Sequence, residues 1–154
     1  MKKIRILSLV GSTYPLDRLT KQVDELGKDK KYEIFSQIGE SNYIPKNIRW
    51  SKFLAYKELQ NKINWADIII SHAGAGSIID VLASKKRLLL FPRLKQYGEA
   101  VDDHQLEICK AFAKKYRLQY TTKKIKIGKI VDYYNKNKNL ASKLIKEIKI
   151  IINL

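Results

Sequence analysis

The segment SHAGAGS, at residues 71–77, combines two glycines with two hydroxyl side chains. It follows the apolar run 66–70 and precedes the apolar run 78–82, an order typical of a strand, a small-residue turn and a helix. Glycine lets the backbone approach an anion closely, and the first N–H groups of a helix face that anion at the positive end of the helix dipole. The pattern therefore predicts a phosphate site formed by Gly74, Ala75, Gly76 and Ser77.

A purely structural interpretation of the same turn stays open. Tight turns between a strand and a helix often need glycine even in proteins that bind nothing there. The spacing is Gly-x-Gly followed by serine, so it matches neither the G-x-G-x-x-G fingerprint nor a P-loop, which also requires a lysine. The turn alone does not separate the two interpretations.

The composition predicts one globular domain over residues 1–154, because 45% of the 154 residues are hydrophobic. The single cysteine, Cys109, excludes an internal disulfide and a cysteine-based zinc site within one chain, and it favours a reducing, cytoplasmic location. The apolar stretch 4–10 contains Arg5 and has no cleavage-like site, so we do not expect a signal peptide. No segment approaches the length needed to span a bilayer.

The positive charge is concentrated near the C-terminus. The chain carries 31 Lys and Arg against 15 Asp and Glu, and residues 110–154 hold 13 of those cations with only two acids, Asp132 and Glu147. This charge suits an anionic partner such as lipid headgroups or nucleic acid, although a solvated lysine-rich face would give the same composition. No helix-turn-helix, RNP-like or zinc-finger pattern accompanies the charge, so no specific nucleic-acid partner is expected.

Strand-like and helix-like segments alternate along the chain. The predicted strands cover residues 4–10, 32–38, 48–53, 67–71, 88–91 and, more weakly, 118–121. The predicted helices cover residues 16–26, 56–66, 77–84, 103–116, 127–135 and 139–153, so that basic helices occupy about 127–153. The runs 67–70 and 88–91 are apolar on both faces, as in central parallel strands. The sequence thus predicts an α/β fold, a Rossmann-like doubly wound parallel sheet.

In such a fold, ligands bind at the carboxyl ends of the strands, where loops 11–13, 72–76 and 92–104 are expected to meet. The stretches GSTYPLDRL (11–19), WADIIISHAGAGSIIDVL (65–82), FPR (91–93) and GEAVDDHQLE (98–107) resemble the nucleotide-binding domain of glycosyltransferase family 28. The resemblance covers residues 4 to about 118. More narrowly, the chain is similar to the free-standing small subunit of two-component enzymes that build capsular or exopolysaccharide repeat units, whose eukaryotic relatives help assemble the dolichol-linked glycan.

The resemblance implies that individual residues bind a uridine diphosphate sugar. Asp80 would accept the ribose hydroxyls, and residues 74–77 would face the diphosphate. His104 and Gln105 would hold the sugar hydroxyls. The backbone of Leu54 would contact the uracil edge, and His72, in the glycine-containing turn, is a further implied donor-binding residue. The first loop would lie against the diphosphate or the acceptor, through Gly11, Ser12 and Thr13.

Each assignment has a simpler alternative. Asp80 in a first helical turn would also favour the helix dipole, and Asp102 or Asp103 would serve as a plain helix N-cap. His72 and His104 would equally be polar groups satisfied near the core. The three adjacent residues 102–104 cannot easily point at one ion, so no metal site is expected.

The implied function is the donor-binding catalytic subunit of an inverting UDP-sugar glycosyltransferase, equivalent to the donor-binding half of a GT-B enzyme. It would transfer galactose, glucuronic acid or N-acetylglucosamine to a lipid-diphosphate-linked saccharide, with no cofactor and no metal. The general base is expected on a membrane-anchored acceptor-binding subunit, with His104 as the candidate within this chain. Such a chain would lie in the cytoplasm, held at the inner face of the membrane through its partner.

Other functions stay open at this point. The chain would also fit a non-catalytic enhancer of a partner glycosyltransferase, or a basic nucleic-acid-binding module. The last predicted helix has an apolar side that fits docking on the partner, contact with anionic lipid, or packing on the chain's own core. That side consists of Ile145, Ile148, Ile151 and Ile152.

Overall fold

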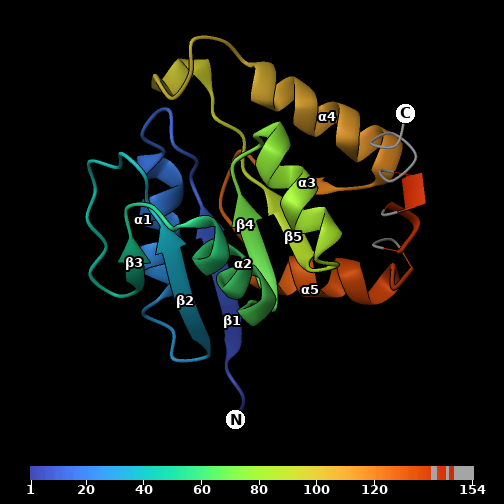
Figure 1. Cartoon of the computed structure of the whole chain (residues 1–154), viewed down its shortest axis with the longest axis horizontal. Helices are drawn as coiled ribbons and strands as arrows, with labels where there is room; N and C mark the ends of the chain where they lie inside the picture. The colour runs from blue at the N-terminus through green and yellow to red at the C-terminus, as the bar shows by residue number, and fades with distance from the viewer. Residues whose placement is uncertain (140–141, 145, 148–154) are drawn as a thin grey trace.

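The computed structural model describes residues 1–139, 142–144 and 146–147. Six parallel strands form one sheet in the order β3-β2-β1-β4-β5-β6, with their carboxyl ends toward the top of Figure 1. The strands are β1 (Ile4–Leu9), β2 (Tyr32–Gln37), β3 (Arg49–Ser51), β4 (Ile68–Ser71), β5 (Arg87–Leu90) and β6 (Gln119–Tyr120). The predicted Rossmann-like α/β fold is confirmed.

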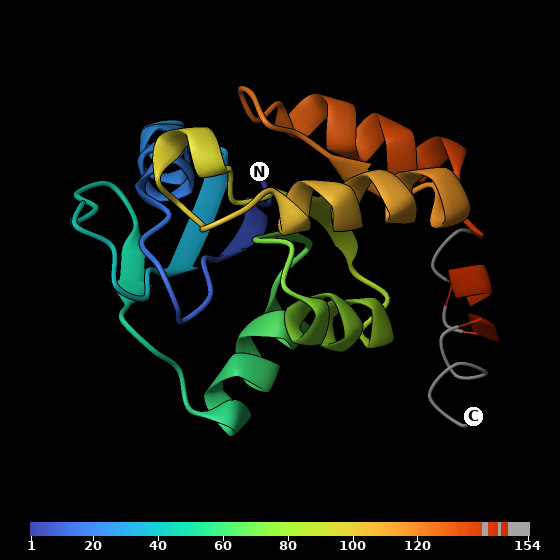
Figure 2. The ribbon, with the colours of Figure 1, turned by 90° about the horizontal axis from the view of Figure 1, so that it is seen from above.

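Helices cover both faces of this sheet (Figure 2). They are α1 (Asp17–Leu26), α2 (Tyr56–Trp65), α3 (Ala75–Ala83), α4 (His104–Tyr116) and α5 (Ile127–Lys136), with a short 3-10 turn η1 (Lys95–Tyr97). Helices α2, α3 and α4 pack on the face that carries Leu7, Ile69 and Leu88. Helices α1 and α5 pack on the opposite face, so both sides of the central strands are buried, as their continuous apolar runs predicted.

Most element boundaries lie within one residue of the sequence-based expectation, and two differ by two residues. The strand expected over 48–53 is only three residues long, and it is followed by a turn in which the Ser51 hydroxyl donates to the Phe53 carbonyl at 2.9 Å. Helix α3 begins at Ala75, two residues before the expected start. The helix expected over 139–153 lies largely outside the described residues, and no helix within the described part is long and apolar enough to cross a bilayer.

The strand order creates a switch point between β1 and β4. From β1 the chain moves outward through β2 and β3, and it then returns to β4 on the other side of β1 and continues through β5 and β6. The ends of the two central strands are paired, with Leu9 beside Ser71. The loops that leave them diverge to opposite faces of the sheet, which opens the crevice where doubly wound folds bind their ligands.

Candidate functional site

The turn between β4 and α3 presents four backbone N–H groups at this crevice. The first hydrogen bond of the helix runs from the Ile78 N–H to the Gly74 carbonyl at 3.0 Å, so the preceding N–H groups have no partner within the helix. They belong to Gly74, Ala75, Gly76 and Ser77. No side chain in the described part of the chain caps this helix end, and both Ala75 and Gly76 are exposed. The mouth of α3 is thus open, uncapped and positively polarised.

The two glycines of this turn are present for different reasons. A methyl group at Gly74 would overlap the Nε2 atom of His72, so packing requires glycine there. A methyl group at Gly76 would meet nothing within 4 Å. Neither residue has a positive φ, so backbone conformation does not require glycine at either position. Packing therefore explains Gly74, whereas the space above Gly76 is left empty by the described residues.

The His72 ring packs at the base of the crevice, against Gly11 on one side and Gly74 on the other. Its Nδ1 lies 3.4 Å from the Leu9 carbonyl oxygen, and its other edge is close enough to Gly11 that an added Cβ there would lie 2.7 Å from Nε2. Burial and then the charge of Arg93 lower the pKa of His72 from 6.5 to about 4, so the ring is neutral at neutral pH. His72 thus sets the spacing between the Gly11 loop and the turn at Gly74.

Gln105 holds the ends of β4 and β5 together. Its Oε1 accepts hydrogen bonds from the Ala73 and Arg93 backbone N–H groups, each at 3.1 Å. The Gln105 oxygen is therefore already engaged within the protein in this conformation. Only its Nε2 group is left to donate to a ligand.

Arg93 clamps the first loop, and the sequence-based reasoning gave it no role. Its guanidinium donates to the carbonyl of Pro15 at 2.9 Å and to the carbonyl of Val10, so it holds both ends of the loop that carries Gly11, Ser12 and Thr13. Only 3% of Arg93 is exposed, and burial lowers its pKa from the ordinary value while the nearby Glu99 charge opposes that shift. The one sequence signal was its position, directly after a buried strand and a proline.

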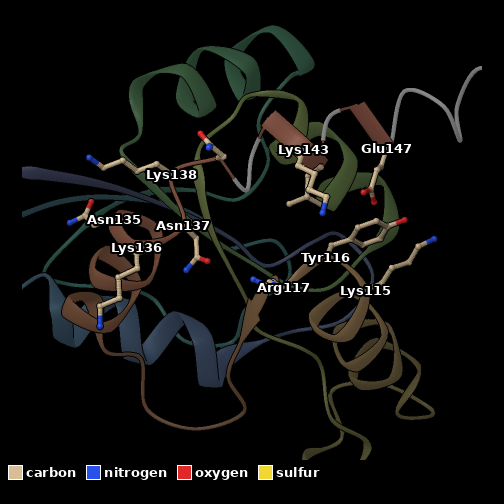
Figure 3. A pocket seen from close by; sticks show the side chains of 11 residues that line it. Lys115, Tyr116, Arg117, Asn135, Lys136, Asn137, Lys138, Lys143 and Glu147 are labelled. Carbon is tan, nitrogen blue, oxygen red and sulfur yellow. The ribbon is translucent and has the colours of Figure 1, made fainter.

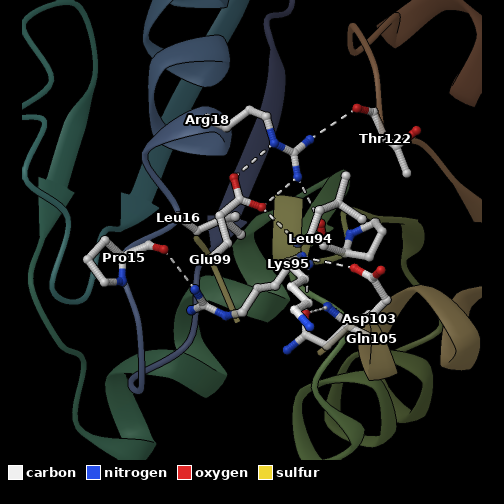
Figure 4. Close-up of polar contacts among 12 residues, drawn as sticks. Pro15, Leu16, Arg18, Leu94, Lys95, Glu99, Asp103, Gln105 and Thr122 are labelled. Atoms are coloured by element: carbon white, nitrogen blue, oxygen red, sulfur yellow. Dashed lines mark hydrogen bonds and ion pairs between the residues drawn. The ribbon is translucent and has the colours of Figure 1, made fainter. Parts of the chain in front are cut away.

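Arg18 makes a second link between loops at the same edge (Figure 4). Its guanidinium donates to both carboxylate oxygens of Glu99 at 2.9 Å, to the Pro92 carbonyl at 2.9 Å and to the Thr122 carbonyl at 3.1 Å. Glu99 also accepts the Leu94 N–H at 2.9 Å. Bidentate pairing of this kind fixes both orientation and distance. The start of α1 and the loops after β5 and β6 are therefore bound to one another.

The other predicted site residues are placed as follows. Asp80 lies in the second turn of α3, since its first turn contains no acid, so the alternative that Asp80 serves the helix dipole is wrong. Ser12 and Thr13 are exposed on the first loop. The Leu54 N–H donates to the Gln37 side chain at 3.1 Å, so the predicted uracil contact would use the Leu54 carbonyl.

The predicted N-cap and general base occupy the start of α4. Asp103 holds the N-cap position, but its carboxylate accepts the Lys95 N–H at 2.9 Å instead of capping the helix, and Asp102 accepts the His104 N–H at 3.0 Å. The His104 side chain is 70% exposed, with Nδ1 3.9 Å from a Glu107 carboxylate oxygen. Its alternative role as a polar group satisfied near the core is wrong.

Within the described part of the chain, no group of three or more His, Cys, Asp or Glu side chains is arranged to hold a metal ion.

The candidate site is an open edge of the sheet and not an enclosed cavity. Two hollows of about 490 and 480 Å³ among the described residues lie along α4, β6 and α5, away from the mouth of α3. Because Ala75 and Gly76 are exposed, the described residues would leave one side of a ligand on the α3 amides uncovered.

The family model described as the glycosyltransferase family 28 C-terminal domain matches residues 5–150. The chain belongs to this family. The match includes the turn at Gly74, Asp80, and the segment that carries His104 and Gln105. The resemblance seen in the sequence is thus confirmed at the level of the family.

Three curated relatives of this family 28 domain are transferases. It is 32% identical over 119 residues to the UDP-N-acetylglucosamine transferase subunit ALG13 of Homo sapiens and 40% identical over 87 residues to that of Candida albicans, covering 74% and 55% of this chain. It is 32% identical over 80 residues, 49% of this chain, to the UDP-N-acetylglucosamine--N-acetylmuramyl-(pentapeptide) pyrophosphoryl-undecaprenol N-acetylglucosamine transferase of Prochlorococcus marinus. The chain spans only 10%, 27% and 21% of the lengths of these relatives.

Among solved structures, the chain is similar to MurG of Acinetobacter baumannii, with a TM-score of 0.54 and 22% sequence identity. The similarity covers 90% of this chain and 42% of that one. At this identity the comparison establishes the fold. It places the chain with one part of a larger glycosyltransferase, in agreement with its GT-B-like, Rossmann-like architecture.

Proposed function

We propose that this chain is the donor-binding catalytic subunit of an inverting glycosyltransferase that uses UDP-N-acetylglucosamine. The observation that carries the proposal is the open, uncapped N-terminus of α3, which lies at the switch point of a family 28 domain. Four N–H groups and a positive dipole end at this position suit the diphosphate of a sugar nucleotide. N-acetylglucosamine is preferred over galactose and glucuronic acid because the names of all three relatives specify it.

The chemistry assigned to the chain is stabilisation of the leaving group. Attack of an acceptor hydroxyl at the anomeric carbon breaks the bond to the UDP oxygen, and negative charge develops on the diphosphate. Helix N–H groups already aimed at that charge lower the barrier, because they need no reorganisation during the reaction. Asp80 is assigned to the ribose hydroxyls and the Nε2 group of Gln105 to the sugar. No metal or other cofactor is invoked in this scheme.

The acceptor half of the reaction is assigned to a second subunit. The described residues leave the site uncovered, and the exposed side chains of Tyr14, Tyr97 and Val101 lie on loops at the same edge, where a second protein surface would bury them. We propose a membrane-anchored partner that binds a lipid-diphosphate-linked saccharide and supplies the base that takes the hydroxyl proton. The undecaprenol-linked acceptor in the name of the Prochlorococcus relative supports this class of substrate. The proposed setting is capsular or exopolysaccharide synthesis at the cytoplasmic face of the membrane.

A thermal-shift panel of UDP-sugars tests the donor assignment. A ligand that binds only the folded state adds about 2.7 kcal/mol of stability at one hundred times its dissociation constant. We expect UDP and UDP-N-acetylglucosamine to raise the melting temperature of the wild-type chain and to have little effect on Asp80→Ala. The matched control is Asp132→Ala, which removes an exposed acid from α5 on the other face of the sheet.

Two outcomes would contradict the proposal. If no uridine nucleotide stabilises the wild-type chain, the mouth of α3 does not bind the donor. If Asp80→Ala leaves transfer by the complete complex unchanged, the chain is a non-catalytic enhancer of its partner. Asp80 serves this purpose better than Gln105, since Gln105 also supports the protein backbone at Ala73 and Arg93.

A further inference from the structure

A lysine-rich segment follows β6 and leads into α5. In the sequence Lys-Lys-Ile-Lys-Ile-Gly-Lys-Ile, at residues 123–130, every lysine is exposed and every isoleucine is buried. Ile125, Ile127 and Ile130 belong to the core between α1, α5 and the sheet. Because the buried isoleucines anchor this segment in the core, the backbone positions of the exposed lysines are fixed. The name lysine surface is used below for Lys123, Lys124, Lys126 and Lys129.

The lysine surface borders a hollow of about 480 Å³ beside the edge strand β6. All four lysines line it, together with Gln119 and Tyr120 of β6 and Ala113 of α4, and no acidic residue is among its lining residues. No ion pair within the described part of the chain involves any of these lysines. Four cations therefore line one concave surface, and none of the described residues that line it is acidic.

Folding does not account for this arrangement. Lys126 is the N-cap residue of α5 and Lys129 lies in its first turn, which contains no acid and receives no side-chain cap. Cations at this end oppose the positive end of the helix dipole, so they cost stability there. An anion held by the lysines would relieve that repulsion.

The second basic hollow of the chain provides a contrast (Figure 3). It measures about 490 Å³ and is lined by Lys115, Lys136, Lys138 and Lys143, among others, but it also contains Glu147. Lys115 and Lys136 lie in the last turns of α4 and α5, where cations favour the helix dipole. Intramolecular electrostatics thus explains part of that second cluster and none of the lysine surface.

We propose that the lysine surface binds the anionic headgroups of a lipid bilayer. Its cations are all lysines, which attract phosphate as point charges, and it offers no arginine for reading base edges. Only one aromatic ring, the partly buried Tyr120, lines the hollow, whereas single-stranded nucleic acid is usually held on stacked aromatic side chains. The choice of a bilayer rests partly on the proposed function, in which the acceptor is a lipid.

The lysine surface is joined to the candidate donor site. The carbonyl of Thr122, directly before it, accepts a hydrogen bond from Arg18, which also donates to Glu99 and to the Pro92 carbonyl. The side-chain amide of Gln22, on α1, donates to the Lys123 carbonyl at 3.2 Å and accepts a hydrogen bond from the Ile125 N–H at 2.8 Å. A bilayer that holds the lysine surface would therefore keep the carboxyl edge of the sheet near the membrane, where a lipid-linked acceptor lies.

Vesicle sedimentation with the full chain tests this proposal. The vesicles contain phosphatidylcholine alone or phosphatidylcholine mixed with phosphatidylglycerol, at low and at physiological ionic strength. The test variant changes all four lysines of the lysine surface to glutamine. The control makes the same change at Lys115, Lys136, Lys138 and Lys143, which removes equal charge from the neighbouring hollow.

We expect binding only to the anionic vesicles, with weaker binding at higher salt. Each lysine close to an anionic surface contributes on the order of fivefold in affinity, so the test variant should bind at least about twentyfold more weakly than wild type and the control less than about fivefold. The UDP thermal shift of the test variant should equal that of wild type. If wild type shows no UDP shift but the vesicle results follow this pattern, the proposed donor function fails and the lipid surface stands.

Several results would overturn the lipid surface. Equal losses in the two variants would show that net charge acts without a defined surface. Equal binding to neutral vesicles would exclude an electrostatic contact. Tighter binding of single-stranded RNA than of vesicles at the same salt, lost in the test variant, would assign the surface to nucleic acid. Self-association of the test variant with unchanged vesicle binding would show that the lysines protect the β6 edge from pairing.

Discussion

A pair of glycine-to-alanine substitutions separates ligand binding from packing at the mouth of α3. Gly76 lies in the first turn of the helix, and an added methyl group meets nothing within 4 Å, so Gly76→Ala should stabilise the fold by up to about 1 kcal/mol through higher helix propensity. For a chain of this size that corresponds to a rise of about 2 to 4 °C in melting temperature. At Gly74 the methyl group would overlap the buried His72 ring, and Gly74→Ala should cost about 1 to 3 kcal/mol.

The expected effect of Gly76→Ala on binding has the opposite sign. Side-chain bonds in a helix tilt toward its N-terminus, so the new methyl group would occupy the space above the N–H groups that we assign to the diphosphate. We expect UDP to bind at least about tenfold more weakly, a loss of about 1.4 kcal/mol, while the protein itself becomes more stable. Thermal unfolding and an NMR titration with UDP measure the two quantities. A stabilised variant that binds UDP like the wild type would refute the placement of the diphosphate, and a destabilised one would show that packing requires Gly76.

Two further predictions concern buried groups outside the site. Burial alone would raise the pKa of Asp24, but hydrogen bonds from the Tyr43 hydroxyl, the Asn47 side chain and the Lys46 and Asn47 backbone outweigh it and hold the pKa below 3.8. Asp24→Asn should therefore lower the free energy of unfolding by about 2 to 4 kcal/mol at neutral pH, and urea titrations should show the difference shrinking as the pH falls through the lowered pKa. Burial raises the pKa of the Cys109 thiol to about 12, so iodoacetamide should modify it only after unfolding, and rapid labelling of the native chain would contradict its buried position.

The sequence was sufficient to predict the fold because the signals involved are local. The apolar runs 67–70 and 88–91 predicted buried parallel strands, and the structure has two neighbouring parallel strands there, β4 and β5. The start of α3 was predicted two residues late, since apolar periodicity begins only at Ile78, whereas the helix itself begins with the hydrogen bond from Ile78 to Gly74. Because this is the first hydrogen bond of the helix, the N–H groups of residues 74–77 have no partner within α3, as the predicted phosphate site requires.

The supports of the site could not be predicted in the same way. Arg93 reaches the carbonyls of Val10 and Pro15 across 83 and 78 positions of sequence, and no local pattern encodes such a contact. Gln105 matched the family motif as a ligand-binding side chain, yet its oxygen supports the ends of two strands. A motif identifies the residue that matters, but only the three-dimensional arrangement shows which of its atoms are already engaged.

The same arrangement explains why one chain would form half of an active site. Arg18, Arg93, Gln105 and His72 fix the loops after β1, β4 and β5 against one another, so the donor edge needs little rearrangement to receive a diphosphate. Preorganised N–H groups gain most of their effect when water is excluded, and nothing described in this chain covers the space above Gly76. In this scheme, a preorganised donor site that stays open to water would bind a nucleotide weakly and catalyse poorly. The partner therefore has two tasks in this scheme, to supply the base and to close the site.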